Sequence, residues 1–313
     1  MSTEVTDVEA TVIKQESLSS SAHKALSSPW ASLAAIVIAV LWTIPTVGLF
    51  ITSFRSEGDI NSSGWWTVFG DLFNGQLPDF TLSNYDTVLY GADTNFSTYL
   101  INSFIITIPA VLIPISIATM AAYAFAWMRF PLRNFLFVAI FALQIVPIQV
   151  TMIPLLSVYV DLGLAGFDAP GGGFYTIWLS HSIFALPLAI YLMHNFMSQI
   201  PGELIESARV DGAGHVQIFR RIMLPLMAPA IAAFGIFQFL WVWNDLLVAL
   251  VFLGPGAEVR VLPTALYQLI GSRGGSWHLL TAGAFITMVV PLIVFLLLQR
   301  AFVRGILAGS VKS

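Results

Sequence analysis

The 313-residue sequence has no cysteine and few charged residues. The lack of cysteine excludes a disulfide framework and any thiolate metal site. Only 10% of the residues are charged, whereas 57% are hydrophobic, and the mean hydropathy is +0.84. These values lie far outside the range of soluble domains and indicate a chain that lies largely within a membrane.

The sequence motifs that carry enzymatic chemistry are also missing. No His and Glu pair has zinc-site spacing, no nucleophile elbow occurs, and no Gly-x-x-x-x-Gly-Lys-Ser/Thr phosphate loop occurs. A chain without that loop does not hydrolyse ATP by the usual route. We therefore expect no enzymatic activity, no catalytic residue, no metal ligand, no cofactor bound by this chain and no nucleic-acid partner.

The sequence contains several long runs of apolar residues. About 20 apolar residues cross a bilayer as a helix, and lipid offers no partner to an unpaired backbone group. Six runs qualify: Trp30–Phe54, Tyr99–Trp127, Phe135–Val160, Phe174–Phe196, Leu226–Leu253 and Leu279–Phe302. We predict an all-α, polytopic membrane protein with six transmembrane helices and lipid around them.

One membrane domain, residues 29–308, is expected between two cytoplasmic tails. Residues 1–28 are polar and Ser-rich and predict a disordered tail, and residues 309–313 form the second tail. The first apolar run is too long for the core of a signal peptide, so we interpret it as a retained span.

The basic residues are distributed unequally between the two sides of the predicted spans. With the N-terminus in the cytoplasm, only Arg55, Arg260 and Arg273 of the 13 Lys and Arg residues fall outside. This bias predicts that both termini lie inside. The two sizeable outer segments are then about 55–97 and 254–277. In the first, Trp65-Trp66 is either an interfacial anchor or a docking face for an outer partner.

A polar island at about 200–225 interrupts the apolar runs. Glu203–Asp211 fits a short amphipathic helix, and Gly212 is expected to end it because only Gly takes a left-handed cap without a steric cost. A second short helix is expected at about His215–Ile222, and Pro225 is expected to restart the chain into span five. Two such helices would form a compact element that a soluble partner can hold, whereas the simpler alternative is an ordinary solvated loop.

The ordered motifs along the chain resemble the permeases of ATP-binding-cassette importers. Glu206-Ser-Ala-Arg-Val-Asp-Gly-Ala, followed by Phe219 and Leu224-Pro225-Leu226, resembles their "EAA" loop. Further resemblance lies in Asn102-Ser103-Phe104, Ala121–Ala126, Arg129-Phe130-Pro131, Trp243-Asn244-Asp245 and the stretch Gln299–Lys312, the last being similar to the carbohydrate branch. The second Ala of the usual loop is Ser207 here, a change between two small residues.

The resemblance implies a type I importer permease of the maltose-importer kind, located in the prokaryotic cytoplasmic (inner) membrane. Its partners would be a second homologous permease, a dimer of ATP-binding subunits that holds ATP and Mg, and an extracytoplasmic solute-binding protein. The residues expected to couple to the ATPase are Glu206, Ser207, Ala208, Asp211, Gly212, Phe219, Leu224 and Pro225. A further contact with the ATPase is expected from Gly309, Ser310 and Lys312. The substrate implied is an oligosaccharide or α-glucoside such as maltose or trehalose.

Polar residues within the spans are the candidates for the translocation pathway. Asp245 would cost about 2.5–3.5 kcal/mol facing lipid, so it should face the interior. There, Asn244 and Asp245 either contact sugar hydroxyls or form a structural pair with another span. Gln144 and Gln149 flank Pro147 and are further candidates. The alternative function is a self-sufficient secondary transporter or channel, which would leave the polar island unexplained.

Overall fold

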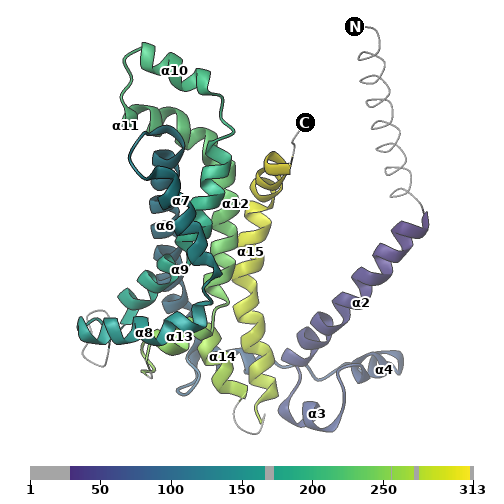
Figure 1. The fold of residues 1–313 in the computed structure, drawn as a ribbon. Coiled ribbons are helices and arrows are strands. Elements are labelled where there is room, and N and C mark those ends of the chain that lie inside the picture. Colours follow the sequence, from purple (N-terminus) through teal and green to yellow (C-terminus); the bar gives the residue numbers. More distant parts are fainter. Residues whose placement is uncertain (1–28, 166–172, 255, 271–274, 311–313) are drawn as a thin grey trace. The chain divides into compact units, whose positions relative to one another are not determined.

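The computed structural model describes residues 29–165, 173–254, 256–270 and 275–310. Within these ranges the chain is helical or in loops, and the only extended pairing is an isolated bridge between Arg55 and Phe80. The chain divides into two compact units, residues 1–81 and 82–313. Figure 1 shows the helices of both units, which we describe separately.

The first unit contains one long apolar helix and two short ones. Helix α2 (Pro29–Ser53) is the first span, followed by α3 (Glu57–Ser62) and α4 (Thr67–Phe73). The indole of Trp65 lies directly over Gly48, where an added Cβ would come within 2.7 Å of it. The segment after the span therefore folds back onto α2, and Gly48 is needed for that close approach.

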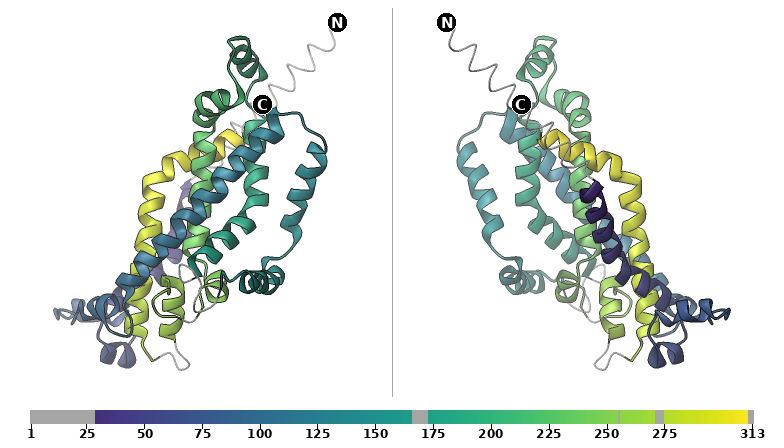
Figure 2. Two further views of the ribbon diagram at one scale, coloured as in Figure 1. Left: turned by 90° about the vertical axis from the view of Figure 1, so that its left-hand side faces the viewer. Right: turned by 90° about the vertical axis from the view of Figure 1, so that its right-hand side faces the viewer.

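The second unit is a bundle of long helices. Its members are α6 (Phe96–Trp127), α9 (Phe174–Met197), α12 (Leu224–Trp243) and α15 (Trp277–Ser310). Helix α6 packs along α9, and α12 packs against α6, α9 and α15 (Figure 2). Shorter helices α5 (Ser83–Tyr90) and α14 (Leu262–Ile270) pack near one end of this bundle.

The third predicted span is not one continuous helix. The chain forms α7 (Arg133–Ala142), a 3-10 turn η1 (Leu143–Ile145) and α8 (Ile148–Asp161), and it bends by 103° at the break before α8. The predicted span over Phe135–Val160 is therefore made of two helices with a bend between them. Pro147 has no N–H to continue the helix and disfavours helical geometry at Val146, whose ψ is 119°.

The fifth predicted span, Leu226–Leu253, is also interrupted. Helix α12 ends at Trp243, and a short helix α13 (Leu247–Phe252) follows. Among the residues that the structure describes, five helices are long and apolar enough to cross a membrane, and there are six spans if the bent α7–α8 pair counts as one. The all-α, multi-span architecture predicted from the sequence is thus confirmed, with two breaks that the hydropathy did not reveal.

Candidate functional site

The polar island folds as a knob at one end of the bundle, seen at the top of Figure 1. We call residues 200–225 the polar knob. Helix α10 (Gly202–Val210) begins it and α11 (His215–Ile218) follows a tight turn. In the turn Gly212 has φ +82°, its N–H donates to Arg209 O, and the N–H of Ala213 donates to Ala208 O. These two bonds form a Schellman cap, the left-handed helix end that the sequence predicted at Gly212.

The polar knob has an inward face that packs on the bundle. Ile205, Ala208 and Ile218 are buried in a cluster with apolar side chains of α6, α9 and α12. Ala208 and the half-buried Phe219 therefore pack within the chain itself. Their size and shape are fixed by this internal packing, and the surface open to a partner lies elsewhere on the knob.

The outward face of the polar knob mixes charged and apolar side chains. Glu206, Ser207 and Asp211 are exposed, as the sequence suggested. Three apolar residues that sequence reasoning missed are exposed beside them: Leu204, Val210 and Val216. Val210, at 87% exposed, directly precedes the turn. Groups of exposed apolar side chains are typical of surfaces that bind another protein.

The second half of the knob runs straight into the bundle. After α11 the chain passes through a π-helical turn (Phe219–Met223) and continues as α12, so His215–Trp243 is one helical stretch of 29 residues. As expected, Pro225 lies in the first turn of α12, which begins at Leu224, but the chain reaches it through the π-helical turn without a break in the helix.

A contact between distant parts of the sequence fixes the knob to α6. The hydroxyl of Tyr123 shares a hydrogen bond of 2.9 Å with Nδ1 of His215, and the Tyr123 ring lies edge-on to Phe219 at 5.3 Å between centroids. Tyr123 belongs to the Ala121–Ala126 motif, but nothing in the sequence indicated its partner. The guanidinium of Arg209 adds a longer contact of 3.5 Å to Trp127 O.

The break in span five is built by Asn244 and Asp245. The amide of Asn244 donates to Leu240 O at 2.8 Å, which satisfies a carbonyl at the end of α12. The carboxylate of Asp245 accepts from the N–H groups of Leu247 and Val248, both at 3.1 Å, at the start of α13. Each side chain thus caps one of the two helix ends, and Asn244 remains exposed.

Asp245 also faces a buried histidine in span four. Nε2 of His181 lies 3.5 Å from Asp245 Oδ2, and His181 is almost fully buried. A cavity with room for at most one water lies among Ser103, Thr107, His181 and Asp245. Asp245 is therefore held within the bundle by hydrogen bonds and by His181, which accounts for its presence in an apolar span.

The other two pathway candidates lie on the bent span. Gln144 is in η1 on one side of the bend and Gln149 is in α8 on the other, and both are exposed. Helix α8 packs against α13, and the rings of Tyr159 and Phe252 lie 5.6 Å apart there. The two interrupted spans therefore meet, at the end of the bundle opposite the polar knob (Figure 1).

The segment between spans five and six is tied to α6 by the Asn102-Ser103 motif. The amide of Asn102 donates to the carbonyls of Glu258 at 2.7 Å and Arg260 at 2.9 Å. Ser103 Oγ accepts from Leu262 N at 3.0 Å. The Arg260 guanidinium also bonds the Tyr99 hydroxyl and lies over its ring. These contacts give the motif a structural explanation that the sequence did not supply.

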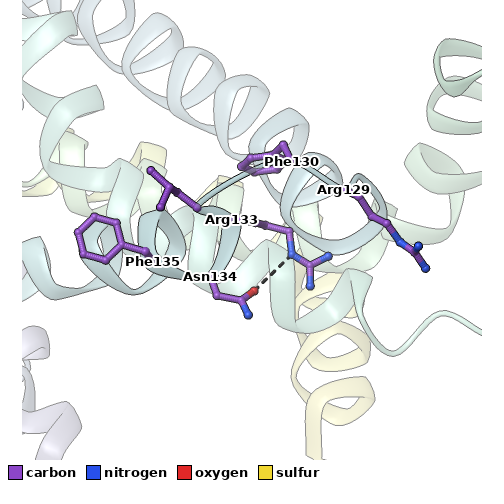
Figure 3. A pocket seen from close by; sticks show the side chains of 6 residues that line it. Arg129, Phe130, Arg133, Asn134 and Phe135 are labelled. Atoms are coloured by element: carbon purple, nitrogen blue, oxygen red, sulfur yellow. Dashed lines mark hydrogen bonds between the residues drawn. The ribbon is translucent and has the colours of Figure 1, made fainter.

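An open hollow lies at the turn between α6 and α7, lined by Arg129, Phe130, Leu132, Arg133, Asn134 and Phe135. Figure 3 shows the guanidinium groups of the two arginines lying apart from each other, with Arg133 Nε donating to Asn134 Oδ1 at 3.3 Å. They form no convergent site, so the hollow is part of an exposed basic turn.

The remaining predicted residues lie at the end of the chain. Gly309 and Ser310 are the last two residues of α15, and Lys312 lies outside the described residues. Within the ranges that the structure describes, no group of three or more His, Asp or Glu side chains is placed to hold a metal ion.

The sequence matches a family model described as "Binding-protein-dependent transport system inner membrane component" over residues 115–308. Among curated relatives, the "Osmoprotective compounds uptake permease protein GgtD" of Synechocystis sp. is 54% identical, covering 90% of this chain and 91% of that protein. The "Alpha-glucoside transport system permease protein AglG" of Rhizobium meliloti is 40% identical, covering 90% and 97%.

Solved structures show the same fold. A chain of a bacterial ABC transporter that imports the acidic polysaccharide alginate is 25% identical, with a TM-score of 0.67, and the match covers 88% of this chain and 98% of that one. A chain of the alginate transporter in complex with its pentasaccharide-bound periplasmic protein is 18% identical, with a TM-score of 0.60.

Proposed function

Since the chain belongs to the family of binding-protein-dependent transport system inner membrane components, we propose that its polar knob couples solute import to ATP hydrolysis by a separate subunit. The chain is a multi-pass component of the cytoplasmic membrane and the permease of an ABC sugar importer. The observation that carries the proposal is the knob itself, a capped pair of helices with an exposed outer face that continues directly into span five.

The outer face of the knob supplies the contact with the ATPase. Glu206 offers a charge to a basic side chain, and Val210 and Val216 offer apolar surface near the turn. Buried apolar anchors surrounded by polar contacts supply most of the binding energy in protein interfaces. Ser207 and Asp211 complete this face, whereas Ala208, Gly212, Phe219, Leu224 and Pro225 hold its shape.

Coupling of this kind requires both termini and the polar knob to lie in the cytoplasm. The charge bias supports that orientation, because Arg209, Arg220 and Arg221 in the knob and Arg129 and Arg133 in the nearby turn all fall on one side. The ATPase would bind ATP and Mg, as this chain has no phosphate loop. Gly309, Ser310 and Lys312 follow the last span and would add a second contact with the same partner.

The complete importer would contain a second homologous permease, two ATP-binding subunits and an extracytoplasmic solute-binding protein. The alginate transporter of similar fold is seen with its periplasmic protein bound. The opposite end of the bundle, with the segment held by Asn102, would face that protein. Asn244 at the break in span five, and Gln144 and Gln149 on either side of the bend in span three, are exposed, and together with Asp245 they are proposed to line the path of the solute.

An oligosaccharide or α-glucoside such as maltose or trehalose is the proposed substrate class. The names of two relatives, one for osmoprotective compounds and one for α-glucosides, support a small hydroxyl-rich solute. Exposed amide side chains such as those of Asn244 and Gln149 both donate and accept hydrogen bonds, as sugar hydroxyls do.

The test is a pull-down of the tagged chain from its native membrane in mild detergent, with identification by mass spectrometry. Recovery of an ATP-binding subunit, a second permease and a binding protein is the expected result. Recovery of this chain alone, under conditions that keep other membrane complexes intact, would contradict the proposal and favour a self-sufficient carrier.

A further inference from the structure

The polar knob is linked to the bundle through the chain at only two spans. Its start follows the end of α9 and its end continues into α12, so spans four and five are covalently joined to it. Span two, α6, has no such link. Any displacement of the knob reaches α6 only through side-chain contacts.

Besides apolar packing and the longer contact of Arg209 with Trp127 O, these contacts include a side-chain hydrogen bond and ring contacts made by one residue of α6, Tyr123. Tyr123 lies one turn before the end of that helix at Trp127 and is 5% exposed. Its hydroxyl bonds His215 at the first residue of α11, and its ring packs against Phe219 where the π-helical turn begins. Tyr123 thus holds both the start of α11 and the turn that leads into α12.

The other end of α6 holds a second element, the segment between spans five and six. The helix is continuous from Phe96 to Trp127 in spite of Pro109 and Pro114. A helix of this length spans roughly 48 Å at 1.5 Å per residue, enough to cross the bilayer. Near its far end, Asn102 binds the segment that carries Glu258 and Arg260. Helix α6 therefore connects the polar knob continuously with the segment between spans five and six.

We propose that Tyr123 is a positioning residue that joins the polar knob to span two, so that movement of the knob is transmitted along α6 to the segment held by Asn102. This inference rests on the coupling role proposed for the knob. It assigns the transmission to a specific hydrogen bond between Tyr123 and His215 and to the ring contact with Phe219.

The experiment uses the purified importer complex and needs no knowledge of its solute. The chain has no cysteine, so Ala257→Cys introduces its only thiol into the exposed segment held by Asn102. The rate of labelling by a membrane-impermeant maleimide is measured with and without ATP and vanadate, which trap the ATPase. We expect the trapped state to change this rate by about fivefold, the lower end of the range for coupling between two sites.

Four substitutions distinguish a loss of transmission from a general loss of stability. Tyr123→Phe removes only the hydroxyl and should abolish the response to trapping, while the complex still assembles. His215→Asn keeps a polar atom near the position of Nδ1 and should retain the response, whereas His215→Ala should lose it. Tyr159→Phe is the matched control, because this buried tyrosine also loses a hydrogen bond, to Ser180, far from the knob.

The outcomes distinguish the inference from the function on which it rests. If trapping changes the labelling rate fully in both Tyr123→Phe and His215→Ala, the proposed role of the Tyr123 contacts is wrong, while the coupling role of the knob is unaffected. Loss of the response in Tyr159→Phe as well would show a general effect of stability and would also overturn it. Because His215 is exposed, its replacement should not prevent folding. Failure of the wild-type chain to copurify with an ATPase would contradict the proposed function itself.

Discussion

Nε2 of His181 lies 3.5 Å from the carboxylate of Asp245, which links span four to the break in span five. The same carboxylate accepts hydrogen bonds from the first free N–H groups of α13. Within a membrane, unpaired backbone groups find no water, so these bonds determine whether the break is tolerated. The Asn-Asp pair is thus a structural device at the point where a solute path would pass.

Asp245→Ala is expected to destabilise the folded chain by roughly 1–2 kcal/mol, because it removes the cap of α13. Thermal unfolding in detergent measures the loss. Asn244→Ala is the control, since its exposed amide bonds only Leu240 O, and it should have a smaller effect on stability. Equal stability of the two variants would show that the carboxylate does not hold the break.

Glu206→Lys is expected to leave the protein in the membrane but to abolish ATP-driven uptake. The reversed charge would face the basic partner proposed for Glu206, and we expect the ATPase recovered in a pull-down to fall by about tenfold or more. Glu203→Lys is the matched control, because Glu203 is an exposed glutamate of the same helix and the change in net charge is identical. Normal uptake with Glu206→Lys would remove Glu206 from the coupling role.

Gly212→Val is expected to destabilise the turn of the polar knob by about 1–2 kcal/mol, since a left-handed backbone is costly for a residue with a Cβ. Gly214 provides the control: it lies two residues away with φ −78°, and both positions have open space around an added Cβ. Gly214→Val should therefore assemble with the ATPase normally, while Gly212→Val should not. Equal assembly would contradict a role for the positive φ.

The features that sequence predicted well are local or compositional. Gly212 follows a short amphipathic helix, and the cap at its position depends only on neighbouring residues. The apolar runs are long enough to be recognised without any tertiary information. The cap at Gly212 and the apolar runs can each be recognised in fewer than 30 consecutive residues. The structure has a helix cap at Gly212 and membrane-spanning helices in the apolar runs.

The features that sequence missed depend on distant partners. Pro147 bends its span by 103°, whereas Pro109 and Pro187 lie within unbroken helices, so proline alone does not decide where a span breaks. Tyr123 and His215 are 92 residues apart in the chain. Nothing local marks either of them as the partner of the other, and the inward orientation of Ala208 follows from the same tertiary packing.

Asn102→Leu is expected to release the segment between spans five and six. The side chain is buried and its amide satisfies two backbone carbonyls, so a Leu of similar size leaves both without a donor. The loss of two hydrogen bonds corresponds to about 1–3 kcal/mol and to roughly a fivefold or greater rise in local opening. Trypsin added from outside should then cut after Arg260 at a correspondingly higher rate.

Ser116→Ala is the control for this prediction, because Ser116 lies on the same helix and its hydroxyl bonds only Leu112 O of its own turn. It should leave the cleavage rate unchanged. The same assay tests the orientation of the chain, because Arg260 is reached by external trypsin only if the polar knob faces the cytoplasm. Cleavage after Arg260 from the cytoplasmic side alone would place the knob outside and would contradict coupling to a cytoplasmic ATPase.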